Sequence, residues 1–188
     1  AKNKGAVQIL KAKSNRNELA FQKVKDQNTS GAFKLFMETY PDADQFNEAM
    51  ARYDKRLFLE HTSPNNLENN LKFIKEHPKS NYLGEAKENV YAFSTADKSV
   101  LSYYHFVKRF PNYPAVPRAW RNIYNLSTQV RTPENIKKFL VQYPDYPFKD
   151  ELEQDYILAN TRYYMISEKG KFGFVDDKTK FSFFGNHI

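Results

Sequence analysis

The sequence contains no cysteine, which excludes disulfide bonds and thiolate chemistry and leaves the cellular compartment open. Of the 188 residues only six are glycine, and no glycine-rich phosphate-binding loop is present. No apolar run approaches the roughly 20 residues that a membrane-spanning helix requires. The basic start of the chain also lacks the apolar core of a signal peptide. The fold therefore has to be held together by apolar packing and hydrogen bonds.

Motifs for catalysis and metal binding are missing as well. The chain has no GxSxG nucleophile motif, no HExxH motif, and no two histidines at metal-ligand spacing among His61, His77, His105 and His187. An acidic cluster lacks the glycine and the spacing of a calcium loop, and we expect it to occupy the first turn of a helix: Asp150, Glu151, Glu153 and Asp155. We therefore expect a protein that is not an enzyme, with no cofactor and no metal.

Aromatic residues are abundant, with 16 Phe and 13 Tyr, and they recur at a fixed spacing. An aromatic residue or histidine followed by proline recurs along the chain, with spacings of 37, 33 and 33 residues between the prolines: Pro41, Pro78, Pro111 and Pro144. A phenylalanine stands five residues before each proline: Phe36, Phe73, Phe106 and Phe139. Eight residues after the proline the chain has Ala49, Ala86, Ala119 and then Leu152. The chain is thus a tandem repeat.

The physical chemistry of one repeat predicts a pair of antiparallel helices. Apolar residues three and four positions apart precede each proline, which places them on one helical face. Proline disfavours the helical conformation of the residue before it, so the first helix ends there, and a second helix follows a short polar turn. The predicted fold is all-α over residues 1–162, with units at about 28–63, 64–96, 97–131 and 132–162 after a leading helix.

Helix starts can also be placed. Ser63-Pro64 and Thr132-Pro133 are typical of a capping residue followed by proline at the first helical position. We expect the equivalent cap of the third unit within Ser94–Asp97, and we expect Pro117 in the first turn of its helix.

The run Ala20–Val24, the segment Asn28–Phe36, Tyr40-Pro41 and Ala49 together resemble the tetratricopeptide-type (TPR-like) repeats of bacterial proteins. The resemblance covers about residues 15–162. It implies a right-handed α-solenoid whose concave groove binds a peptide, a helix or another subunit. The sequence departs from the pattern at His77, where an aromatic residue is usual, and at Leu152, where alanine is expected.

The tail, residues 163–188, changes to a pattern of short strands and turns, which predicts a β-hairpin or meander. Its segment Lys169–Asp176 resembles the start of a WG-type β repeat, with Phe172 in place of the usual tryptophan. Isolated hairpins are marginally stable in water. Either this hairpin packs on the last helix pair, or the chain is cut from a longer protein whose β region continues; we favour the second.

The net charge is +7, and the surplus lies in residues 1–30 and 97–131, each with five more basic than acidic residues. The first group predicts a solvated leading helix. In the third unit, the candidate partner-binding residues are Lys108, Arg109, Arg118, Trp120 and Arg121, since arginine beside an exposed aromatic residue is typical of interface anchors. The alternative is a set of solvated helix faces with Trp120 in the core beside Ala119.

We hence expect a non-catalytic scaffold that binds a partner protein or peptide in its groove. One alternative is binding of a polyanion, either nucleic acid or an acidic envelope polymer, through the basic third unit. Nucleic acid is the less favoured of these, because +7 is modest and acidic segments interrupt the basic ones. Another alternative is a regulatory module of a larger protein. The resemblance implies a bacterial periplasm or cell envelope, with the cytoplasm left open, and the sequence does not indicate an oligomeric state.

Overall fold

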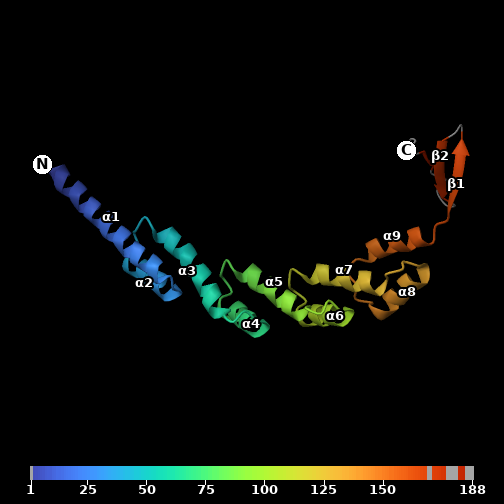
Figure 1. Cartoon of the computed structure of the whole chain (residues 1–188), viewed down its shortest axis with the longest axis horizontal. Coiled ribbons are helices and arrows are strands. Elements are labelled where there is room, and N and C mark those ends of the chain that lie inside the picture. Colours follow the sequence, from blue (N-terminus) through green and yellow to red (C-terminus); the bar gives the residue numbers. More distant parts are fainter. Residues whose placement is uncertain (1, 169–170, 177–181, 185–188) are drawn as a thin grey trace. The chain divides into compact units, whose positions relative to one another are not determined.

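At each repeated aromatic–proline pair the structure has the same arrangement: one helix ends, a tight connection follows, and a second helix begins. The computed structural model describes residues 2–168, 171–176 and 182–184 (Figure 1). This described part is mostly helical and ends in a short antiparallel sheet. Its elements are α1 (Lys2–Gln27), α2 (Ser30–Thr39), α3 (Phe46–His61), α4 (Leu67–Glu76), α5 (Leu83–Ser94), α6 (Val100–Arg109), α7 (Val116–Ser127), α8 (Pro133–Gln142), α9 (Lys149–Ala159), β1 (Tyr163–Glu168), β2 (Lys171–Asp176) and β3 (Ser182–Phe184).

The first helices of the four pairs, α2, α4, α6 and α8, each have ten residues and start at the same place in the repeat. Each is capped by a side-chain oxygen that accepts a hydrogen bond from the backbone N–H three residues on. The cap stands twelve residues before the proline every time: Thr29, Asn66, Ser99 and Thr132. The prediction of Thr132 is confirmed. The predictions of Ser63 and of Ser94–Asp97 are wrong, since Asn66 and Ser99 occupy the register position.

The residue before each proline closes the first helix. Its backbone N–H donates to the carbonyl of the phenylalanine four residues earlier, at 2.8–2.9 Å in all four repeats. Its ring lies 5.0–5.4 Å from that same phenylalanine ring. A connection of six residues then leads to the second helix: 40–45, 77–82, 110–115 and 143–148. The proline thus marks the short turn that the sequence predicts, and the structure shows that the connection has the same length in all four repeats.

The repeated phenylalanines and small residues form the core. Phe36, Phe73, Phe106 and Phe139 are at most 2% exposed, as are Ala49, Ala86, Ala119 and Leu152. Burial of one phenylalanine contributes roughly 1.5–3 kcal/mol. Pro117 lies in the first turn of α7, as expected. Leucine at position 152 is accepted in the core where the other repeats have alanine.

A second repeated residue, which the sequence analysis did not identify, lies at the end of each second helix. Threonines 33 residues apart donate a hydroxyl hydrogen bond to the carbonyl four residues earlier, at 2.6–2.8 Å: Thr62, Thr95, Thr128 and Thr161. The first two prolines of the repeat are 37 residues apart, whereas the later ones are 33 apart. The four extra residues lie in α3, which has 16 residues where α5 and α7 have 12. Four residues make about one helical turn, so the core face of α3 is kept.

The chain divides into two compact units, residues 1–96 and 97–188. In the first unit, α2 packs on α3 and α4 on α5, and α1 and α3 contact the first helix of the following pair. Phe21, Phe33, Phe36 and Ala49 form one core cluster, and Phe58, Phe73 and Ala86 another. A buried carboxylate, Asp54, joins α3 to the next connection by accepting hydrogen bonds from Ser80 Oγ (2.6 Å) and Asn81 N–H (2.8 Å).

In the second unit, α6 packs on α7 and α8 on α9. The space between these pairs is filled by rings, because Trp120 and Tyr124 of α7 lie 5.0–6.3 Å from the rings of Phe139, Tyr143 and Tyr146. Counted back from Thr62 and Thr128, Trp120 is at the position of Asp54. Tyr146, two residues after its proline, is at the position of Ser80. The same contact is therefore polar in one unit and aromatic in the other.

The tail is β structure, as predicted. β1 and β2 pair antiparallel from Tyr163↔Asp176 to Glu168↔Lys171, and β3 pairs antiparallel with β2. The WG-type segment Lys169–Asp176 lies partly outside the described residues, and that resemblance stays a prediction. Among the described helices, none combines the length and apolar character that a membrane span requires.

Candidate functional site

The basic residues singled out in the third repeat lie on α6 and α7, and Lys108 and Arg121 form ion pairs with the fourth repeat. Lys108 Nζ is 2.6 Å from Asp145 Oδ2, at the connection after α8, and 5.4 Å from the centre of the Tyr104 ring. The hydrogen bond from Lys108 lowers the pKa of Asp145 and raises that of Lys108. Lys108 thus links α6 to the next repeat rather than standing alone as a cation.

Arg121 makes the corresponding link between α7 and α9. Its Nη2 is 2.8 Å from Glu151 Oε1, and its guanidinium lies 4.0 Å from the centre of the Phe148 ring. The hydrogen bond lowers the pKa of Glu151. Arg109 lies over the ring of Phe110 at 5.1 Å, and Arg118 is exposed on α7. The predicted basic set is therefore spread along two helices and balanced in part by acids of the fourth repeat.

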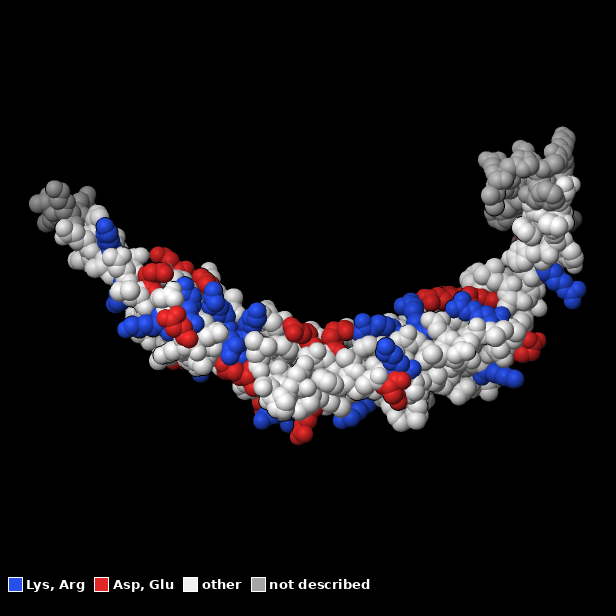
Figure 2. All heavy atoms as spheres, in the orientation of Figure 1, with Lys and Arg blue, Asp and Glu red and all other residues white. Residues whose placement is uncertain are grey.

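Trp120 is 6% exposed and lies in the core beside Ala119, which is the alternative that the sequence left open. The acidic cluster has a structural explanation too. Asp150 and Glu151 lie in the first turn of α9, as expected, and Asp155 accepts a hydrogen bond from Tyr124 (2.8 Å) and pairs with Arg131 (3.2 Å). Over the face shown in Figure 2, basic and acidic side chains are intermixed in the helical segments of each unit.

An open pocket of about 400 Å³ lies where α6 meets the end of α8. Its walls are apolar and aromatic, and the residues that line it are Val100, Leu101, Tyr104, Gln142 and Tyr143. Tyr104 packs edge-on against Trp120 and Tyr143, with ring centres 6.0 and 5.4 Å apart, so the wall of the pocket is continuous with the core. Leu101 is 62% exposed at the rim. This pocket has the shape and lining to take an apolar side chain.

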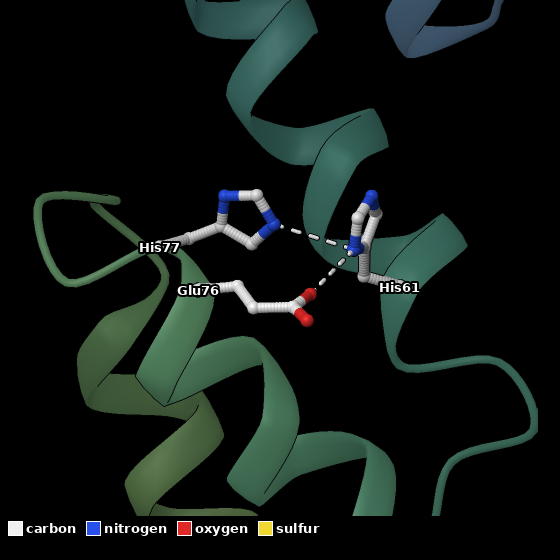
Figure 3. Close-up of side chains that lie close together, drawn as sticks. All are labelled: His61, Glu76 and His77. Carbon is white, nitrogen blue, oxygen red and sulfur yellow. Dashed lines mark hydrogen bonds and ion pairs between the residues drawn. The ribbon is translucent and has the colours of Figure 1, made fainter.

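The structure also brings together three side chains whose contact the sequence spacing does not predict. His61 ends α3, Glu76 ends α4 and His77 follows it, and the His61 and His77 ring nitrogens are 3.2 Å apart (Figure 3). Burial, followed by the charge of the neighbouring His61, lowers the pKa of His77 below its ordinary value of 6.5. A separation of 16 residues matches no single-helix ligand motif. The repeat could have predicted this contact, because His61 is the last residue of a second helix and His77 precedes the next proline, and these two positions meet in the structure.

No protein-family model matches this sequence, and a search of curated protein sequences found no similar protein, so the function of these surfaces has to be argued from their geometry.

Proposed function

We propose that the protein is a non-catalytic scaffold that binds a peptide segment of a partner protein, with one apolar side chain of that segment held in the pocket between α6 and α8. The observation that carries this proposal is the pocket itself. It is open, apolar and rimmed by the exposed Leu101, while its inner wall is fixed by ring packing of Tyr104 and Tyr143. A rigid aromatic wall gives contact area without the entropic cost of ordering a flexible side chain.

The polar groups at the rim support a peptide as the occupant. Gln142 lines the pocket, and an amide side chain can donate to and accept from the backbone of an extended segment. The Lys108–Asp145 ion pair adjoins the pocket through Tyr104. Because Lys108 and Arg121 already have acidic partners, a polyanion would have to displace these pairs, which favours a protein partner over nucleic acid or an acidic polymer.

The TPR-like resemblance supports the same proposal at a larger scale. In this view the helix pairs are units of a right-handed α-solenoid, and the protein acts in the bacterial cell envelope. Four repeats with the same cap, the same connection length and the same buried phenylalanine are the features on which this part of the proposal rests.

A crosslinking pull-down from the native host tests the proposal with matched variants. Leu101→Asp places a charge at the pocket rim, and Val130→Asp places one at a similarly exposed site (66%) between α7 and α8. We expect a partner captured by the wild type to be lost with Leu101→Asp and kept with Val130→Asp. Capture that is equal for both variants, or no capture by the wild type, would contradict the proposal.

A further inference from the structure

The three side chains at the end of α3 and α4 offer nitrogen and oxygen atoms to one point. His77 Nε2 is 3.2 Å from His61 Nδ1, and Glu76 Oε2 is 3.8 Å from the same nitrogen. One ligand atom from each residue lies within 4.8 Å of the others. Figure 3 shows the two imidazole rings directed toward each other with the carboxylate of Glu76 beside them. Two nitrogens and an oxygen thus converge from two different helices.

The rings are held in place by the repeat. His77 lies in the position that Tyr40, Phe110 and Tyr143 occupy elsewhere, with its ring 5.0 Å from Phe73. Phe73 in turn packs edge-on against Phe58 of α3 at 5.2 Å. His77 therefore keeps the orientation that the buried frame gives to any ring at this position, and His61 is fixed as the last residue of α3.

The junction of α7 and α8 shows that this frame does not require ligand residues. There Tyr124 and Phe139 pack at 5.0 Å, and Phe139 and Tyr143 also at 5.0 Å, as Phe58, Phe73 and His77 do in the first unit. The residues equivalent to His61, Glu76 and His77 are Ser127, Gln142 and Tyr143. The same packing is thus built without histidine or a carboxylate, and packing alone does not account for the three residues.

The distances suit a small divalent cation. With metal–nitrogen bonds of about 2.0–2.1 Å, two ligand atoms of a tetrahedral site are about 3.3 Å apart. The nitrogens are at 3.2 Å, and the carboxylate at 3.8 Å can close the difference by a small rotation, because its side chain is 42% exposed. Two imidazoles with one carboxylate favour zinc and similar transition metals over magnesium or calcium, which prefer oxygen ligands.

We propose that His61, Glu76 and His77 bind one zinc-class divalent cation, which joins the end of α3 to the end of α4. Three protein ligands leave a fourth position for water or for a group of a binding partner. The ion is a clamp between two successive helix pairs, since α3 belongs to one pair and α4 to the next. This inference is independent of the pocket between α6 and α8, which lies in the other unit.

The test is a titration of the full-length protein with Zn²⁺ against a chromophoric chelator. The variants take their residues from the α7–α8 junction: His61→Ser, Glu76→Gln and His77→Tyr. We expect one ion per chain for the wild type, and a loss of affinity for each histidine variant larger than the roughly 10–100-fold that loss of a ligand's hydrogen-bond partner costs. Glu76→Gln should weaken binding by about tenfold, because an amide oxygen is a poorer ligand than a carboxylate.

His105→Asn is the control, because His105 is exposed on α6 in the other unit and should leave the affinity unchanged. Two further readouts are a visible Co²⁺ spectrum of tetrahedral type and a rise in melting temperature with Zn²⁺, both absent in His77→Tyr. If the wild type binds Zn²⁺ no better than His61→Ser and His77→Tyr, or loses as much with His105→Asn, the two histidines are only a hydrogen-bonded pair and the proposal is wrong.

Discussion

Phe106 is the most deeply buried residue of α6. It is 1% exposed, and its ring contacts those of Phe110 and Tyr113, so it ties the helix to the connection that follows. The exposed residues of the same helix, such as Leu101, make no comparable contribution to the core.

Phe106→Ala should therefore lower the free energy of unfolding by about 3–5 kcal/mol, as is typical when a buried phenylalanine is truncated. Urea denaturation followed by circular dichroism measures the change. Leu101→Ala is the matched control on the same helix and should change the free energy by less than about 0.5 kcal/mol. A melting curve for Phe106→Ala that coincides with the wild type would remove Phe106 from the core.

At the scale of single residues, most of the positions that determine the helices and their core can be predicted from the sequence. Phe106, Pro111 and Ala119 are recognisable because one-dimensional spacing determines helical face and helix end. The caps Asn66 and Ser99 were missed because several serines, threonines and asparagines stand near each helix start, and only the distance to the proline separates them. His61 and His77 were missed because their contact depends on how one helix pair meets the next, which no local spacing encodes.

Between elements, α7 is joined to α8 and α9 by buried tyrosines. Tyr124 is 5% exposed, and its hydroxyl donates a hydrogen bond to Asp155 of α9. Burial, followed by the hydrogen bond and charge of Asp155, raises the pKa of Tyr124 from 10.0 to about 12. Burial is also the main cause that raises the pKa of Tyr146 to about 12. Both hydroxyls are therefore held in the neutral form in the folded protein.

This predicts an alkaline loss of stability. Below pH 10 the folded and unfolded chains hold the same proton on Tyr124, so its contribution is constant. Between pH 10 and about 12 the unfolded chain loses that proton first, and the free energy of unfolding falls as the pH rises. Urea denaturation on either side of pH 10 measures the slope, which should be shallower in Tyr124→Phe.

Tyr163→Phe is the control, because Tyr163 is 55% exposed on β1 and its loss should leave the slope unchanged. Tyrosinate absorbance of the folded protein offers a second measurement, in which Tyr124 and Tyr146 should ionise well above the ordinary tyrosine pKa of 10.0. Equal slopes for the wild type and Tyr124→Phe would show that Tyr124 is as accessible folded as unfolded.

For the whole molecule, the division into residues 1–96 and 97–188 bears on how the chain opens. In repeat proteins each unit is stabilised by its own packing and by its nearest neighbours, so a local loss of packing does not act equally along the chain. The contacts of Phe36 and of Phe106 lie within different units.

Hydrogen exchange should reveal this locality. Phe106→Ala should accelerate amide exchange in α6–α9 more than in α1–α5, and Phe36→Ala should do the reverse. The pair of variants is its own control, because both remove the same side chain from the same repeat position. Acceleration that is uniform along the chain for both variants would mean that the protein opens as one cooperative unit.

The extra turn in α3 shows where a repeat of this kind can be lengthened without disturbing its packing. The four additional residues lie between Ala49 and Thr62. Each cap still stands twelve residues before its proline, each connection still has six residues, and the threonines are still 33 residues apart. Insertions elsewhere in the repeat would rotate a core face or lengthen a fixed turn, whereas a whole turn within the second helix adds about 6 Å and leaves both ends in register. A repeat of this kind can therefore be lengthened by whole helical turns of its second helix, and α3 is longer than α5 and α7 by one such turn.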